Sequence, residues 1–224
     1  MKKAFLLFNF LFFFSCGYHS KKVILSQNIE YKDTLIYSVS AKILEDNYRA
    51  DYRSNMFLYI INSKNDTLIA QREEGLSPVP LIFEDFNNDN LLDIRYGYNS
   101  NYFFEMILLF DPKTKQFVKI NGIDSPDYAY SENIKGTELY YSYTPDGCGK
   151  NNWISNLFLV KDFKIIPIGI IKYKQCMDDE KGVYVYSISE EKETLMTSFS
   201  IIEANRHRES FFKYYWKKNY KKFI

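Results

Sequence analysis

Apolar and polar residues alternate along most of the chain after residue 33. In the first such run, between Leu35 and Ile43, the odd-numbered positions are apolar, and from position 38 the even-numbered positions are serine or lysine. A period of two residues is typical of a strand with one buried face. Two further pairs of runs enclose the polar segments 63–66 and 111–115, which predicts two hairpins. Similar runs lie at 81–83, 94–98, 138–144, 153–160, 163–173, 183–189 and 194–202.

The strand-like runs follow one another at short intervals, and no long helical periodicity separates them. This spacing predicts an all-β fold, an antiparallel meander arranged as a sandwich or in a propeller-like way. No segment rich in proline, glycine or serine divides the chain, so we expect one β domain over residues 27–202.

The last segment, residues 203–224, has a different pattern. Its apolar residues recur at spacings of three and four among many lysines, which predicts a basic, aromatic amphipathic helix at the C-terminus. Three interpretations stay open: the stripe packs on the β domain, the helix lies on anionic lipid headgroups, or a strand through 211–216 takes its place. The stripe consists of Phe212, Tyr215, Trp216, Tyr220 and Phe223.

Composition narrows the possible functions. The chain has 224 residues, of which 46% are hydrophobic and 18% aromatic, which is enough for a buried core. Its 29 basic and 28 acidic residues nearly balance, so no global basic field exists to hold a nucleic acid. Only two histidines occur, which disfavours a histidine-based zinc site or a nucleophile that needs a histidine base.

The N-terminus predicts export and a lipid anchor. Two lysines precede an apolar run over 4–14 that is too short for a hydrocarbon core of roughly 30 Å, so we expect a secretory signal over residues 1–15. Small Ser15 before Cys16 resembles the cleavage box of bacterial lipoproteins. The resemblance implies a lipidated Cys16, a tether over 16–26 and a place in the bacterial cell envelope, at the outer membrane facing the periplasm. The alternative is an ordinary cleaved signal with a spare thiol.

The two other cysteines predict a disulfide. Cys148 and Cys176 flank the strand-like runs 153–160 and 163–173, which a short polar break separates. If those runs form a hairpin, both cysteines lie just beyond its open end, within reach of a bridge. In an oxidising compartment we therefore expect a structural disulfide, since no Cys-x-x-Cys spacing supports a redox-active pair.

One segment, residues 85–93, carries candidate metal chemistry. Side-chain oxygens stand at its positions one, three, five and nine, and position seven can add a backbone carbonyl. Alternate residues of a tight loop can turn such oxygens inward, and Ca²⁺ takes six to eight hard oxygen ligands. Position six is Asn90, and asparagine tolerates the positive φ of a sharp bend better than most residues. The predicted calcium ligands are Asp85, Asn87, Asp89, Leu91 through its carbonyl, and Asp93.

This segment resembles the calcium loop of FG-GAP and VCBS-type β repeats, Asp-x-Asn-x-Asp-Gly-x-x-Asp between strands, with Asn90 in the glycine position. Together, 83–89 and 110–117 resemble a family of small bacterial envelope proteins with a single such loop, some of which are periplasmic lysozyme inhibitors. The alternative is an Asx-rich turn whose side chains satisfy local backbone groups without a metal.

A second polar segment, 143–153, combines two glycines, side-chain amides and a tryptophan beside the predicted disulfide. A loop pinned in this way loses little entropy on association, so it is a candidate surface for a partner. The alternative is a disulfide-pinned turn whose tryptophan begins the next core strand. The candidate binding residues are Asp146, Lys150, Asn151, Asn152 and Trp153.

The leading expectation is a non-catalytic, calcium-braced envelope lipoprotein that binds a protein or glycan partner of the cell envelope. Inhibition of a cell-wall hydrolase is a sharper version of it. One alternative is a carboxylate-dependent glycoside hydrolase, for which Glu105, Asp127 and Glu138 are available, although no spacing marks them as a pair. Another is a structural subunit of an envelope assembly.

Overall fold

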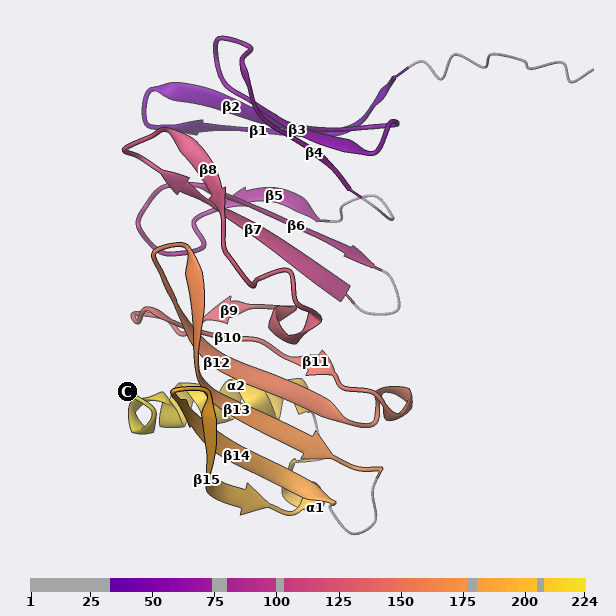
Figure 1. Ribbon diagram of the computed structural model, residues 1–224, viewed down its shortest axis with the longest axis vertical. Coiled ribbons are helices and arrows are strands. Elements are labelled where there is room, and N and C mark those ends of the chain that lie inside the picture. The colour runs from indigo at the N-terminus through magenta and orange to yellow at the C-terminus, as the bar shows by residue number, and fades with distance from the viewer. Residues whose placement is uncertain (1–32, 74–79, 100–102, 177–180, 205–207) are drawn as a thin grey trace, which may run out of the picture. The chain divides into compact units, whose positions relative to one another are not determined.

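The computed structural model describes residues 33–73, 80–99, 103–176, 181–204 and 208–224. Over these residues the chain forms antiparallel β-sheets and a short C-terminal helix, which confirms the predicted all-β fold (Figure 1). The predicted signal peptide, Cys16 and the tether lie outside the described residues. None of the described helices has the length and apolar character that crossing a membrane requires.

The first sheet is a four-stranded meander in which consecutive strands pair. Its last two strands form the hairpin predicted around 63–66. There the Asn62 side-chain oxygen accepts hydrogen bonds from the backbone N–H groups of Lys64 and Asp66, at 3.0 and 2.9 Å. Such a turn satisfies backbone groups that leave the ladder. The strands are β1 (Leu35–Ile43), β2 (Asp46–Arg53), β3 (Phe57–Ile61) and β4 (Thr67–Arg72).

The second sheet is also a four-stranded meander. Its last two strands form the hairpin predicted around 111–115. Asp111 accepts hydrogen bonds from the Lys113 backbone N–H at 3.0 Å and the Thr114 hydroxyl at 2.8 Å, and Pro112 presets the turn. The strands are β5 (Leu81–Glu84), β6 (Asp93–Asn99), β7 (Phe103–Asp111) and β8 (Gln116–Lys119).

The third sheet has the order β15-β14-β13-β12-β10-β9, and β11 pairs with β12. Its longest hairpin pairs Trp153 with Tyr173 at the open end, as the cysteine-flanked runs predicted. Its strands are β9 (Glu132–Asn133), β10 (Leu139–Tyr141), β11 (Thr144–Pro145), β12 (Trp153–Lys161), β13 (Lys164–Lys174), β14 (Gly182–Ser189) and β15 (Lys192–Phe199). Two short 3-10 helices lie in the connections: η1 (Pro126–Tyr128) between β8 of the second sheet and β9, and η2 (Cys148–Lys150) between β11 and β12.

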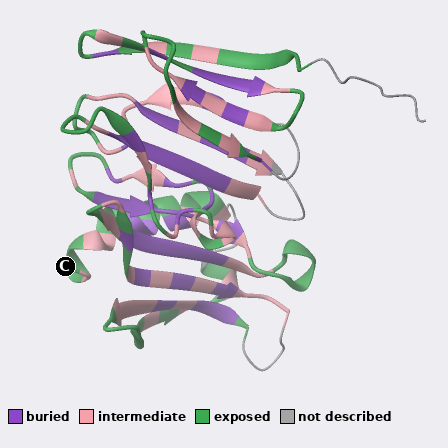
Figure 2. Cartoon of the chain, turned by 45° about the horizontal axis from the view of Figure 1, so that its top comes forward, coloured by how far each residue is buried: buried purple, intermediate pink, exposed green. Residues whose placement is uncertain are grey.

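Apolar side chains hold the sheets face to face. Side chains of strand β7 pack on both faces of the second sheet. Met106 and Leu108 belong to an apolar cluster shared with the first sheet, whereas Ile107 belongs to a cluster shared with the third sheet. A strand buried on both faces carries a continuous apolar run, and residues 106–110 are all apolar and buried (Figure 2). The second sheet is therefore the middle layer of the β domain.

The C-terminal segment covers the other face of the third sheet. It consists of α1 (Ile201–Ala204), α2 (Arg208–Asn219) and η4 (Tyr220–Lys222). Of the predicted stripe, Phe212, Tyr215 and Trp216 are buried in a cluster with strands of the third sheet. The Trp216 indole N–H also donates to the Ser155 hydroxyl of β12 at 2.8 Å. This confirms the interpretation in which the stripe packs on the β domain.

The end of the last strand and the burial of the first strand differ from the prediction. The last strand ends at Phe199 rather than 202, because Ser200 caps a helical turn: the Glu203 carboxylate accepts hydrogen bonds from the Ser200 backbone N–H at 2.7 Å and from its hydroxyl at 2.8 Å. In β1, the predicted buried face is buried only toward its end. Leu35 and Tyr37 are 53% and 47% exposed, since the packed residues of the first sheet come mainly from β2 and β3.

Candidate functional site

The loop 85–93 connects β5 to β6, and its ends meet because Glu84 and Asp93 are paired across the two strands. Two asparagines inside it have positive φ, 60° at Asn88 and 68° at Asn90. The sequence predicted such a bend at Asn90, and the backbone angle confirms it. The loop thus turns sharply twice within nine residues, which brings its polar side chains toward one another.

Loop carboxylates accept hydrogen bonds from the loop's own backbone. The two oxygens of Asp85 accept from the N–H groups of Asp89 and Asn90, at 3.1 and 3.0 Å. Asp89 accepts from the Leu91 N–H at 2.8 Å and from the Asn87 side-chain amide at 2.9 Å. These bonds satisfy backbone donors that no strand partner reaches, so the Asx-rich turn considered as an alternative is present.

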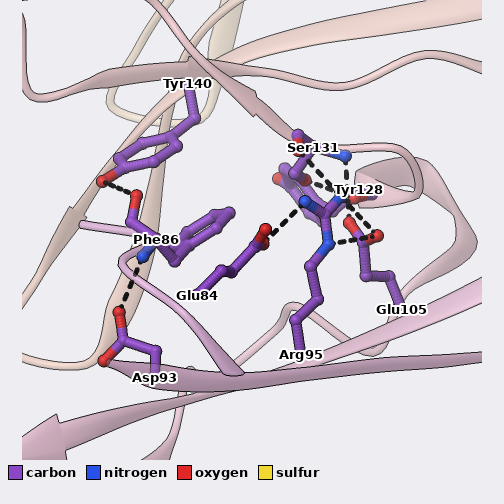
Figure 3. A network of polar contacts seen from close by, with 8 residues as sticks. All are labelled: Glu84, Phe86, Asp93, Arg95, Glu105, Tyr128, Ser131 and Tyr140. Carbon is purple, nitrogen blue, oxygen red and sulfur yellow. Dashed lines mark hydrogen bonds and ion pairs between the residues drawn. The ribbon is translucent and has the colours of Figure 1, made fainter. Parts of the chain in front are cut away.

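Asp93 anchors the loop from the inside. It is fully buried, and one of its oxygens accepts a hydrogen bond from the backbone N–H of Phe86 at 3.0 Å (Figure 3). The other oxygen accepts from the backbone N–H of Phe110 on β7 at 2.8 Å. Burial raises the pKa of Asp93 to about 7, although the N–H donors act in the opposite direction. The side chain joins the loop to the middle of the second sheet.

Phe86 attaches the loop to the third sheet. Its ring stacks on Tyr140 of β10, with ring centroids 4.7 Å apart, and the Tyr140 hydroxyl donates to the Phe86 carbonyl at 3.2 Å. The Arg95 guanidinium lies 5.9 Å from the centre of the Phe86 ring. The loop is therefore fixed between two sheets at the place where they face each other (Figure 3).

Arg95 is the centre of a polar network beside the loop. Its guanidinium pairs with Glu105 of β7 at 2.6 Å and with Glu84 of β5 at 2.9 Å, and it donates to the Ser131 carbonyl at 2.9 Å. The second Glu105 oxygen accepts from the Ser131 N–H at 2.9 Å. Burial raises the pKa of Glu105, and Arg95 opposes that shift. The network joins the second sheet to the segment that leads into the third (Figure 3).

A pocket of about 290 Å³ opens beside the loop and this network. Its Glu132 carboxylate also contacts Lys213 of α2 at 2.7 Å and the Tyr141 hydroxyl. Carboxylates, amides and one guanidinium offer hydrogen bonds in both directions, which suits a polar ligand. The lining residues are Glu84, Asp85, Phe86, Asn88, Arg95, Ser131, Glu132 and Asn133.

The donor set of the loop fits a hard cation, since Asp85, Asn87 and Asp89 supply oxygens, and a hydrogen-bonded carboxylate oxygen keeps a second lone pair. These side chains are not arranged around a common point as the ligands of a bound Ca²⁺ would be. Across the described ranges, no three His, Cys, Asp or Glu side chains are grouped as a metal site. The Asp93 oxygens instead face the N–H groups of Phe86 and Phe110. Calcium at 85–93, with the Leu91 carbonyl as a further ligand, stays a prediction.

The predicted disulfide joins Cys148 to Cys176, whose Cα atoms lie 6.4 Å apart just beyond the open end of the β12–β13 hairpin. The Asn152 side-chain oxygen accepts from the backbone N–H groups of Gln175 and Cys176, at 2.9 and 3.3 Å. The bridge and these hydrogen bonds pin the 146–153 loop against the end of β13.

The candidate partner residues in this loop fall into two groups. Asn152 and Trp153 are engaged inside the protein: the Trp153 indole N–H donates to the Lys150 carbonyl at 2.9 Å, and Arg208 of α2 lies over its ring at 5.9 Å. Asp146, Lys150 and Asn151 are exposed. The internal contacts of Trp153 match the alternative in which it begins a core strand, whereas the three exposed residues stay candidates for binding.

The three carboxylates named for an enzyme lie on different elements. Glu105 is on β7, Asp127 in η1 and Glu138 in the turn between β9 and β10. Glu105 uses its oxygens on Arg95 and Ser131. Sequence reasoning missed this network, although a glutamate inside the buried run of β7 was a readable signal, because a buried carboxylate requires a partner.

No known family model matches this chain, and no curated protein sequence matches it. Among solved structures, the chain is similar to one described as the structure of a Xanthomonas type IV secretion system related protein. The two share 12% sequence identity with a TM-score of 0.49, over 74% of this chain and 98% of the other.

Proposed function

We propose that this protein is a non-catalytic binding protein of the bacterial cell envelope, held by a lipid on Cys16, that recognises a protein or glycan partner. The observation that supports it best is the polar pocket beside the 85–93 loop, whose walls are held by an ion pair of the second sheet and a hydrogen bond from the third. A wall fixed before binding loses little entropy when a ligand arrives. Hydroxyls and amides, which glycans and peptides present, match its acceptors and donors.

We further propose that Ca²⁺ binds the loop 85–93 and braces it. The three aspartates lie within nine residues, and their mutual repulsion falls when a divalent cation sits among them. The carboxylates of Asp85 and Asp89 are close to the loop surface and would turn toward the ion. Asp93 would keep its internal hydrogen bonds or exchange one of them for the ion.

Calcium should raise the melting temperature of the protein, and Asp89→Ala should remove most of that increase. Among the described residues, the hydrogen bonds of Asp89 stay within the loop, so in a chelator the variant should melt close to the native protein. The measurement is thermal unfolding followed by circular dichroism in Ca²⁺ and in EDTA. Asp66→Ala, in an exposed turn of the first sheet, is the matched control. Equal losses for Asp89→Ala in both conditions would show that the loop is an ordinary turn.

A photo-crosslinker at the pocket should capture the partner. Asn88 and Asn65 are both exposed and have similar φ values of 60° and 64°, but only Asn88 lines the pocket. We expect a benzophenone on Asn88→Cys, in the mature chain with Cys16→Ser, to form one discrete adduct in envelope extracts, scored by mass spectrometry for protein and for glycan. The same label on Asn65→Cys should not. If both positions give the same adducts or neither gives any, the pocket is not the binding site.

A further inference from the structure

A second concave surface lies on different elements, between the edge strand β15 and helix α2. It is a groove of about 440 Å³. Its floor is aromatic: the Phe199 ring contacts Phe211 and Tyr215 edge to face, each at 5.8 Å between centroids. Lys218 and Lys222 stand among its lining residues and are both exposed. The groove therefore combines apolar surface with positive charge.

Strand β15 leaves one edge open along this groove. Within the described part of the chain, β15 pairs only with β14. Leu195 and Met196 in the middle of the strand are 54% and 46% exposed. An exposed edge strand carries a row of N–H and C=O groups that can pair with another extended chain. The side chains of such a chain alternate, so every second one would face the groove.

The groove is positively charged, so it favours a negatively charged occupant. Between Arg208 and Lys222 the only acidic residue is Glu209. Lys213 is paired with Glu132, whereas no carboxylate of the described residues lies within ion-pair distance of Lys218 or Lys222. A second copy of this chain would bring the same lysines as well as a glutamate of β15, so it matches the charge of the groove less well than an acidic segment does. A flat bilayer would neither fill the hollow nor pair with the strand edge.

We propose that the groove and the open edge of β15 bind an extended acidic peptide segment of a protein partner. The segment adds a strand to the third sheet, sets apolar side chains on Phe199 and Tyr215, and places carboxylates near Lys218 and Lys222. This mode of recognition draws affinity from main-chain hydrogen bonds and selectivity from alternate side chains. It shares no residue with the polar pocket, so it stands independently of the function proposed above.

The test uses a fluorescein-labelled octapeptide whose groove-facing positions, every second residue, carry leucine, phenylalanine and two glutamates, with threonine at the positions between them. It is titrated with the full mature chain and followed by fluorescence anisotropy. Reversing both lysines, with Lys218→Glu and Lys222→Glu together, should weaken binding by about tenfold or more, because two attractive contacts become repulsive. Lys64→Glu and Lys113→Glu together, the same change of charge at exposed turns of the first and second sheets, should leave the dissociation constant unchanged. A peptide with lysine in place of glutamate should not bind.

Two outcomes separate strand addition from other modes. N-methylation of one of the two alternating sets of peptide residues should abolish binding, since it removes the donors that face β15. If neither methylated peptide loses affinity, or if the charge-reversed protein binds as tightly as the native one, the proposal fails. Vesicles of phosphatidylglycerol that bind the native protein but not the charge-reversed one, with no peptide binding, would also overturn it. Unchanged circular dichroism spectra would show that the variants fold.

Discussion

Replacing Trp216 with alanine should lower the free energy of unfolding by about 3–5 kcal/mol, the range for removing a large aromatic side chain from a core. Trp216 is fully buried between the third sheet and the C-terminal segment. Its N–H donates to the Ser155 hydroxyl, which in turn donates to the Ser142 carbonyl at 2.6 Å. The measurement is urea denaturation followed by circular dichroism.

Two further variants make this prediction specific. Tyr214 lies on the same helix but is 65% exposed, so Tyr214→Ala should change the unfolding free energy by less than about 0.5 kcal/mol. Trp216→Phe keeps most of the apolar surface but loses the indole donor, and we expect a loss between those of the two alanine variants. If Trp216→Ala and Tyr214→Ala cost the same, α2 does not hold the third sheet.

The strands and the helix could be predicted because their patterns are local. A period of two in β1, polar turns at 63–66 and 111–115, and spacings of three and four in the last segment each depend on neighbouring residues. The same patterns do not predict how much of a strand's apolar face is buried by other parts of the protein. Leu35 and Tyr37 have the alternation of a buried face and are exposed, because covering them depends on other sheets. The turn at Ser200 was readable from Glu203 three residues later and was missed.

The candidate site was predictable in part for the same reason. The position of the 85–93 loop, its bend at Asn90 and the Cys148–Cys176 bridge depend on spacing along the chain, and the structure contains all three. Where the Asp93 oxygens point depends on Phe110, which is distant in sequence. The polar pocket could not be predicted, since its walls come from several segments that only the packing of two sheets brings together.

Replacing Arg95 with methionine should cost about 3–5 kcal/mol of stability, because removing one partner of a buried ion pair leaves an uncompensated charge. Arg95 and Glu105 side chains are 20% and 4% exposed. The matched control is Arg53→Met, whose ion pair with Asp33 joins side chains that are 34% and 38% exposed. That variant should lose less than about 1 kcal/mol. Chemical denaturation of both variants measures the difference.

The cause of that loss can be checked by a second change and by pH. Burial already raises the pKa of Glu105, and without Arg95 the pKa rises further. A carboxyl group whose folded pKa lies above its unfolded value contributes stability at low pH that is lost as the pH rises through the folded pKa. The loss of unfolding free energy in Arg95→Met should therefore be smaller at pH 5 than at pH 8.

A second variant tests the same cause. Adding Glu105→Gln removes the buried charge while keeping an acceptor for the Ser131 N–H. The double variant should regain at least half of the lost unfolding free energy, and its loss should not depend on pH. A deficit that is the same at both pH values and persists in the double variant would mean that Arg95 acts through its packing on Phe86 instead.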